Sequence, residues 1–417
     1  MKQNLLLVLI LTAFGYACSK KEDAKPNTPP SAFTVTGKQT NSDLLLTWTK
    51  AKDPEGDLVS YTIIYKDTLA KNITDTSYII KNVPYASTIA GSIIAKDAKG
   101  ASTTEPFSVT TTENPYVLIP DLNFEKALIA LKIDDVQDGK LLRSKAEAVT
   151  ELNVSYKSIS NLQGIEAFKN LLSLICYTNQ LTSLDVSKNV KLTNLSCGGN
   201  QLTSLDVSKN ISLTSLACSD NKLTNLDVSK NVNLKEVYCY TNQLTNLDVS
   251  KNVNLTYLYC YNNQLSNLDV SKNVNLTYLH CYNNQLTNLD VSKNVNLTEL
   301  FSHKNQLTNL DVSKNVNLIS LYCYNNQLTN LDVSKNVNLT YLYCYTNQLT
   351  NLDVSKNVNL GQLYCYYNQL TSLDVSKNTN LSFLWCYNNK IQTICVNSLS
   401  QPKNWITDAT TSYKVCN

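Results

Sequence analysis

Cysteine is the residue whose spacing in this sequence most invites a chemical interpretation. Ten cysteines share one position of a 21-residue period, and Ser302 stands at that position once. Thiols can bind metals, but no period supplies the closed set of four ligands that a structural zinc site needs. Parallel strands in register would also hold these side chains too far apart for relaxed disulfides. We therefore expect buried, free thiols in an apolar interior. The ten are Cys176, Cys197, Cys218, Cys239, Cys260, Cys281, Cys323, Cys344, Cys365 and Cys386.

Histidine is the next candidate for a catalytic role, because its side chain can exchange protons near neutral pH. The sequence holds two, His280 and His303, and neither belongs to a motif with a nucleophile or an associated carboxylate. A catalytic site needs such groups to converge in one cleft. We therefore predict that the protein is not an enzyme.

Carboxylates recur as regularly as the cysteines. One aspartate per period runs from Asp185 to Asp374, and a lysine follows each of them three residues later. We interpret these opposite charges as a neutralised row rather than a row of metal sites. The segment 134–139 is similar to a calcium loop, but Val136 occupies a ligand position there. The sequence predicts neither a metal nor a cofactor.

The sequence repeats internally, and the repeat pattern predicts the structural elements that position these residues. From residue 174 to residue 389 the chain repeats every 21 residues, and an asparagine such as Asn179 marks each turn. Each period has two similar halves, Leu-x-x-Leu-x-Cys-x-x-Asn and Leu-x-x-Leu-Asp-Val-Ser-Lys-Asn. Apolar residues alternate in both halves, which predicts short strands with an apolar inner side. One coil would enclose Leu181, Leu184, Val186, Leu192, Leu195 and Cys197.

This pattern resembles the leucine-rich repeat family, in particular its bacterial class of 21-residue repeats with nested halves of ten and eleven residues. The step from Leu152 to Leu174 is similar to a first repeat of the internalin type. The resemblance implies a mainly β fold with a leucine-rich repeat solenoid over residues 174–396. A small helical N-terminal cap and the first repeat would occupy residues 113–173. Helical spacing over 123–133 fits such a cap.

Aromatic side chains line the outward side of the strands that contain the cysteines. In the run from Tyr257 to Tyr261 the leucine and the cysteine point inward, so the three tyrosines point outward. In leucine-rich repeats this sheet normally forms a concave surface. Rigid aromatic side chains are enriched at binding surfaces, so we predict a ligand-binding role. The alternative is that stacked rings only stabilise the parallel strands. The predicted ligand-binding residues are Tyr238, Tyr240, Tyr257, Tyr259, Tyr261, Tyr278, His280, Tyr282, Phe301, His303, Tyr322, Tyr324, Tyr341, Tyr343, Tyr345, Tyr364, Tyr366, Phe383, Trp385 and Tyr387.

The last segment of the chain is expected to cover the open end of the solenoid. In the continued register Cys395 takes the place of an outward aspartate, so it lies outside the row of buried thiols. Residues 397–417, with Trp405 and Ile406, are left to form a C-terminal cap. We predict a disulfide between Cys395 and Cys416 that fastens this cap. The alternative is two unpaired surface thiols.

The first residues have the features of an export signal. An apolar run too short to span a bilayer precedes Cys18, so residues 1–17 are typical of a signal peptide. The Ala17-Cys18 junction resembles the lipobox of bacterial lipoproteins, which implies that Cys18 carries lipid; the alternative is an ordinary cleaved signal. Residues 19–23 resemble an export tag of Bacteroidetes lipoproteins, which implies the outer membrane with the protein facing the cell exterior. A proline-rich flexible tether over 18–31 would follow.

Residues 32–112 have the pattern of a separate small domain. Short alternating runs are separated by turn signals such as those in 53–57, which predicts a β-sandwich. The order of Trp48, Tyr61 and Tyr85 resembles a fibronectin type III domain, and most such domains are spacers.

These features predict a lipid-anchored cell-surface protein that binds a protein or a glycan through its aromatic side, in adhesion or recognition. The alternative function is a passive structural or glycan-capturing surface array. With 36 basic and 33 acidic residues, the chain shows no charge pattern that favours nucleic acid. We expect a monomer with an extracellular partner, attached to the membrane only through its lipid.

Overall fold

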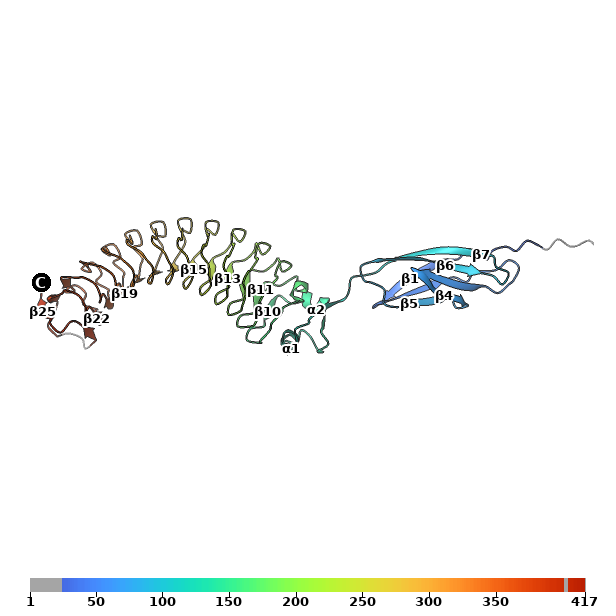
Figure 1. Ribbon diagram of the computed structural model, residues 1–417, viewed down its shortest axis with the longest axis horizontal. Coiled ribbons are helices and arrows are strands. Elements are labelled where there is room, and N and C mark those ends of the chain that lie inside the picture. The colour runs from blue at the N-terminus through green and yellow to red at the C-terminus, as the bar shows by residue number, and fades with distance from the viewer. Residues whose placement is uncertain (1–24, 401–403, 417) are drawn as a thin grey trace, which may run out of the picture. The chain divides into compact units, whose positions relative to one another are not determined.

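The structure, a computed structural model, describes residues 25–400 and 404–416. The predicted signal peptide, Cys18 and the first part of the predicted tether lie outside the described residues. The chain divides into two compact units between Asn114 and Pro115 (Figure 1). Among the described residues, no helix has the length and apolar character needed to cross a membrane.

The first unit consists of two antiparallel sheets that share one apolar core. Leu44 and Trp48 from one sheet pack with Tyr61 and Ile63 from the other, and the Trp48 and Tyr61 rings meet edge to face at 5.4 Å. The resemblance to fibronectin type III domains stays a prediction. The first sheet has the order β1 (Val35–Thr40), β2 (Asp43–Trp48) and β5 (Ser77–Ile80); the second has the order β4 (Asp67–Ile73), β3 (Ser60–Tyr65), β6 (Thr88–Lys96) and β7 (Ser102–Thr110).

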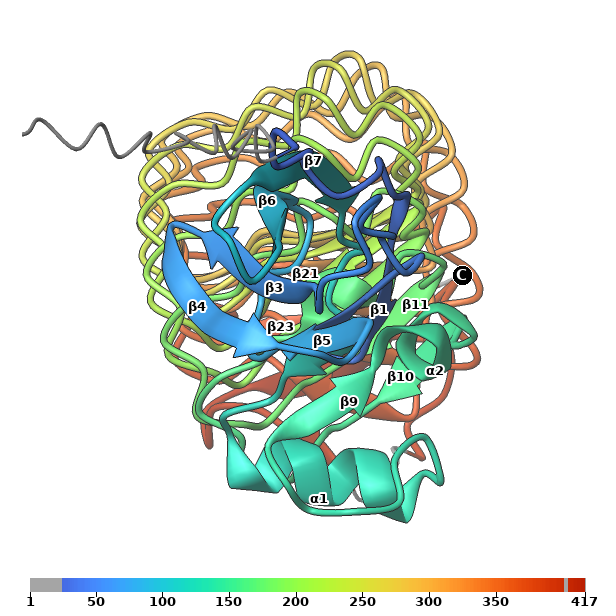
Figure 2. The same cartoon turned by 90° about the vertical axis from the view of Figure 1, so that its right-hand side faces the viewer.

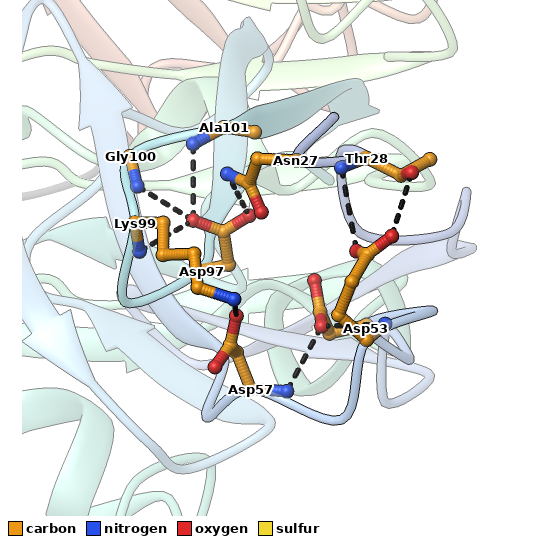
Figure 3. Close-up of polar contacts among 9 residues, drawn as sticks. Asn27, Thr28, Asp53, Asp57, Asp97, Lys99, Gly100 and Ala101 are labelled. Carbon is orange, nitrogen blue, oxygen red and sulfur yellow. Dashed lines mark hydrogen bonds and ion pairs between the residues drawn. The ribbon is translucent and has the colours of Figure 1, made fainter. Parts of the chain in front are cut away.

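Polar contacts tie the start of the described chain to this unit (Figure 3). One oxygen of the buried Asp97 carboxylate accepts hydrogen bonds from the three backbone N–H groups of residues 99–101, and the other accepts one from Asn27 Nδ2 at 2.9 Å. The Lys99 ammonium lies 2.9 Å from the Asp57 carboxylate. These bonds hold the end of the predicted tether against the loops of the sandwich.

The second unit begins with a cap that covers the first coil of the solenoid (Figure 2). Helix α1 (Leu122–Ala130) starts at Asp121, whose side chain accepts hydrogen bonds from two backbone N–H groups of the first turn. The second oxygen of Asp121 accepts hydrogen bonds from Ser160 and Asn161, which belong to the first coil. The helix ends three residues earlier than predicted, because Lys132 has a φ of 60° that no helix can continue. The cap also contains β8 (Tyr116–Leu118), β9 (Lys140–Leu142), α2 (Arg143–Glu147) and the 3₁₀ helix η1 (Ile165–Ala167).

A buried carboxylate closes the loop that is similar to a calcium loop. Glu125 on α1 is fully buried, and its Oε1 accepts hydrogen bonds from the backbone N–H groups of Asp138 and Gly139 at 2.8 and 2.5 Å. Across residues 25–400 and 404–416, no three His, Cys, Asp or Glu side chains form a group that could hold a metal ion.

The solenoid is built on one parallel sheet of thirteen short strands. Figure 1 shows its coils following an arc with the strands on the inner side. Successive strands are paired in register, so that each leucine lies beside the leucine or valine of the next coil. The strands are β10 (Glu151–Asn153), β11 (Ser173–Ile175), β12 (Asn194–Ser196), β13 (Ser215–Ala217), β14 (Glu236–Tyr238), β15 (Tyr257–Tyr259), β16 (Tyr278–His280), β17 (Glu299–Phe301), β18 (Ser320–Tyr322), β19 (Tyr341–Tyr343), β20 (Gln362–Tyr364), β22 (Phe383–Trp385) and β24 (Trp405–Ile406).

Two rows of asparagines pair the backbone at the turns of the coils. Asn263 Nδ2 donates to the carbonyls of Cys239 and Cys260 at 3.1 and 3.0 Å, and its Oδ1 accepts from a backbone N–H of an earlier turn. Asn273 in the second row is fully buried and donates to two carbonyls of earlier coils at 2.9 and 3.0 Å. Each asparagine therefore links neighbouring coils, and this explains why it recurs at fixed positions.

The C-terminal segment continues the solenoid with irregular strands. Strands β21 (Leu373–Asp374), β23 (Thr393–Val396) and β25 (Ser412–Val415) form a parallel sheet, while β24 pairs with β22. Cys395 lies beside Asp374 in this register, and a disulfide joins it to Cys416. Trp405 is partly buried against the end of the core.

Candidate binding surface

The outward side chains of the inner sheet fall into three columns that run along the solenoid. In each strand the middle residue is buried, while the first and third are usually half-buried and point outward. The first strand residues form the first column, the third strand residues the second column, and the residues after each cysteine position the third column. All twenty predicted ligand-binding residues lie in these columns, either on β14 to β20 and β22 or two residues after the end of each of these strands, and we call them the aromatic surface.

Rings in the second and third columns stack face to face. From Tyr259 to Trp385 the second column has centroid distances of 4.1 to 4.6 Å and interplanar angles of 4 to 18°. From Tyr240 to Tyr387 the third column has distances of 4.1 to 4.7 Å and angles of 6 to 16°. The spacing of about 4.8 Å between parallel strands sets this stacking. The ring faces inside a column are therefore covered, and the surface offers ring edges and hydroxyl groups.

The first column is less regular than the other two. Tyr257 and Tyr278 stack at 4.8 Å, but Glu299, Ser320 and Gln362 interrupt the aromatic side chains that follow. This column is therefore a mixed polar and aromatic border.

Both histidines lie inside the stacks. His280 lies 4.1 Å from the rings of Tyr259 and Phe301, and burial lowers its pKa although the Glu299 carboxylate raises it. Its Nε2 lies 3.1 Å from Glu299 Oε2 on the next coil, a contact that the sequence analysis did not expect. Burial lowers the pKa of His303 to about 3. Both imidazoles are therefore neutral at pH 7.

Several phenols of the aromatic surface have a raised pKa. Burial raises the pKa of Tyr238 to about 12, and it also raises the pKa of Tyr259 and Tyr322. Neutral phenols remain hydrogen-bond donors at physiological pH. The surface thus combines apolar rings with uncharged polar edges.

One aromatic side chain beside the surface was missed. Tyr367 is half-exposed at a turn with a φ of 53°, and its ring contacts those of Tyr366 and Tyr387 edge to face at 5.6 and 5.7 Å. Its neighbour Tyr366 in the sequence was the only available signal, because the other coils from Thr178 to Asn388 have no aromatic residue at this turn.

The aspartate row has a local structural role. In each coil from Asp185 to Asp374 the carboxylate accepts a hydrogen bond from the backbone N–H of the serine two residues later, as at Asp269 and Ser271 at 2.9 Å. This bond lowers the pKa of Asp269, and the charge of Lys272 contributes less. The aspartates therefore close turns, and the lysines offset their charge at longer range.

The row of ten cysteines is buried and free of disulfides. Burial raises the pKa of thiols such as Cys218 and Cys281 to about 12. Only the thiolate reacts readily with electrophiles. These side chains are thus inert apolar residues of the core.

We expect the ten thiols to resist iodoacetamide at mildly alkaline pH in the folded chain. The raised pKa keeps the thiolate fraction low, and the core excludes the reagent. Peptide mass spectrometry without reduction should show the ten alkylated only after unfolding, and Cys395 linked to Cys416 throughout. Labelling of Cys260 or Cys281 in the folded chain would contradict this arrangement.

Comparisons with known proteins place this geometry in a family. A family model described as Leucine Rich repeats (2 copies) matches residues 253–294. The functional domain of InlJ from Listeria monocytogenes, whose description includes a cysteine ladder, is 35% identical, with a TM-score of 0.64 over 72% of this chain and 70% of that one. The internalin InlF from the same organism has the same fold, at 23% identity and a TM-score of 0.61 over 72% of this chain and 96% of that one. No curated protein matches the chain in sequence. The chain belongs to the leucine-rich repeat family and forms an internalin-like solenoid.

Proposed function

We propose that this protein is a bacterial cell-surface lipoprotein that recognises a protein partner through the aromatic surface. The observation that carries the proposal is the pair of stacked columns, which present ring edges and neutral hydroxyls over eight neighbouring strands. Internalin-like solenoids are commonly used for protein recognition, which supports the same conclusion.

The stacking favours a protein over a glycan as the main partner. A sugar ring binds an aromatic side chain through the face of the ring, and within the two columns those faces are covered by neighbouring rings. A protein surface can instead pack against ring edges and accept hydrogen bonds from the phenols. An edge-lined surface of this kind suits a broad, uncharged protein interface.

Recognition accounts for these side chains better than catalysis does. His280 and His303 are held neutral between the stacked rings of neighbouring coils. A passive surface array is the second candidate, and the regular outer rows of threonine and asparagine would permit it.

A protein-capture experiment with matched variants distinguishes protein recognition from the function of a passive surface array. The mature chain, immobilised, is exposed to detergent-solubilised surface proteins of candidate host cells. A variant with Tyr257, Tyr259 and Tyr261 replaced by serine is run in parallel. A control variant carries Val232→Ser, Val253→Ser and Val274→Ser, three half-exposed side chains away from the strands. We expect a protein retained by the native chain and the control but lost by the tyrosine variant. Equal retention by all three would remove the aromatic surface from the function.

The lipid anchor is proposed from the Ala17-Cys18 junction. We expect Cys18→Ser to move the protein from the membrane fraction to the soluble fraction, because no other attachment is proposed. Fractionation followed by immunoblotting measures the shift, with Cys260→Ala as a control for the loss of a free thiol. A Cys18→Ser variant that stays in the membrane fraction would exclude lipid attachment at this residue.

A further inference from the structure

A hollow lies on the inner side of the solenoid where the aromatic columns begin. It has a volume of about 360 Å³, and Tyr177 and Tyr240 stand at its two ends. Both residues belong to the third column, which holds only Gly198 and Ser219 between them. With about 4.8 Å between strands, three steps separate the two tyrosines by about 14 Å. The hollow therefore takes the place of two missing rings.

The end of the third column leaves one ring face uncovered. Tyr240 stacks on Tyr261 at 4.4 Å through one face, and no ring of the described chain covers the face toward the hollow. At the opposite wall, Tyr177 is held by an edge contact with Tyr156 at 4.6 Å and by a hydrogen bond between their hydroxyls. The hollow thus offers what the interior of the columns cannot, a free aromatic face with room beside it.

The floor of the hollow is polar. Ser219 lines the hollow with only 7% of its surface exposed. A Cβ atom added to Gly198 would come within 3.0 Å of the backbone and hydroxyl oxygens of Ser219, so the glycine preserves the space. Asp220 also lines the hollow. The Ser219 hydroxyl can both donate a hydrogen bond to a ligand with hydroxyl groups and accept one from it.

We propose that this hollow binds one neutral hexopyranose ring, stacked on Tyr240 and hydrogen-bonded to Ser219 and Asp220. A pyranose has an apolar C–H face for the ring and hydroxyls that donate to a carboxylate. An aromatic side chain of a partner protein would fill the space but would leave Ser219 and Asp220 without hydrogen bonds to the ligand. The carboxylate of Asp220 would repel an anionic ligand. The site goes beyond the proposed protein recognition, since its ligand differs and its residues other than Tyr240 lie outside the aromatic surface.

The test uses the mature chain and ligand-observed saturation-transfer NMR. The probes are the methyl glycosides of glucose, galactose, mannose and N-acetylglucosamine, with p-cresol as a model of an aromatic side chain. We expect at least one glycoside to bind. Ser219→Tyr should abolish this binding, because it extends the third column into the hollow. Gln362→Tyr, a matched addition between the aromatic side chains of Tyr341 and Phe383, should leave it unchanged.

Milder variants test the roles of the two contacts. Ser219→Ala and Tyr240→Leu should each weaken glycoside binding roughly threefold to tenfold, with a native circular dichroism spectrum. Binding of no glycoside, of p-cresol alone, or of glycosides equally to Ser219→Tyr would overturn the proposal. Protein capture is measured on the same variants. Ser219→Tyr with lost glycoside binding and intact protein capture separates this site from the proposed function.

Discussion

Replacing Tyr257, Tyr259 and Tyr261 together with serine should weaken partner binding by at least about 1 to 2 kcal/mol, as expected for aromatic hot spots. The variant removes three adjacent rings from the middle of the aromatic surface while the leucine core beneath stays intact. Five ring contacts with neighbouring coils are lost, so we also expect some loss of stability. Titration of the captured partner measures binding, and urea unfolding measures stability.

Two controls separate binding from stacking. Phenylalanine at the same three positions keeps the rings and removes only the hydroxyls, so it should retain the stability and part of the affinity. If the columns served only to stabilise the strands, the serine variant would be less stable but would bind the partner as the native chain does. That outcome would contradict the proposed role of the surface.

Ser302→Cys should stabilise the solenoid by about 1 to 2 kcal/mol. Ser302 is fully buried in the row of cysteines, and its hydroxyl has no partner in the described part of the chain. Burying an unpaired hydroxyl is unfavourable, and cysteine at this position replaces it with a small apolar side chain. Urea unfolding under reducing conditions measures the change.

The reverse exchange is the matched control. Cys281→Ser, one coil away, should destabilise the chain by about 1 to 3 kcal/mol, because it adds a second unpaired hydroxyl to the same row. An unchanged or lower stability for Ser302→Cys would mean that the hydroxyl of Ser302 is satisfied in solution, and the structural interpretation of the row would be wrong.

The sequence predicts the solenoid because every repeat has the same pattern of apolar and polar positions. Alternation in Leu258 and Cys260 determines which side chains face inward, and the period places each of them beside its equivalent in the next coil. The same register places Cys395 beside Asp374, outside the buried row, and the structure joins it to Cys416. Leu184, in contrast, is only partly buried, because its coil lies near the irregular N-terminal cap.

Contacts between coils were harder to predict than burial. His280 contacts Glu299, which is 19 residues away in the sequence and belongs to another column. No local sequence motif predicts that pair. The availability of ring faces also depends on side-chain torsions, which a sequence pattern does not specify. Tyr238 shows the effect: it meets Tyr259 edge to face at 86°, although the rings further along are nearly parallel. The hollow beside Tyr240 was missed although it follows from the small residues Gly198 and Ser219, because the sequence pattern does not show which ring face borders it.

Hydroxyl-radical footprinting tests the central claim most directly. The mature chain is oxidised briefly with and without the captured partner, and the oxidation of each tyrosine is read by mass spectrometry. We predict that the partner protects tyrosines of the aromatic surface, such as Tyr261 and Tyr324. Exposed tyrosines elsewhere, such as Tyr116 and Tyr156, should be oxidised equally in both samples. Protection of Tyr116 or Tyr156 with the aromatic surface unprotected would show that the partner binds somewhere else.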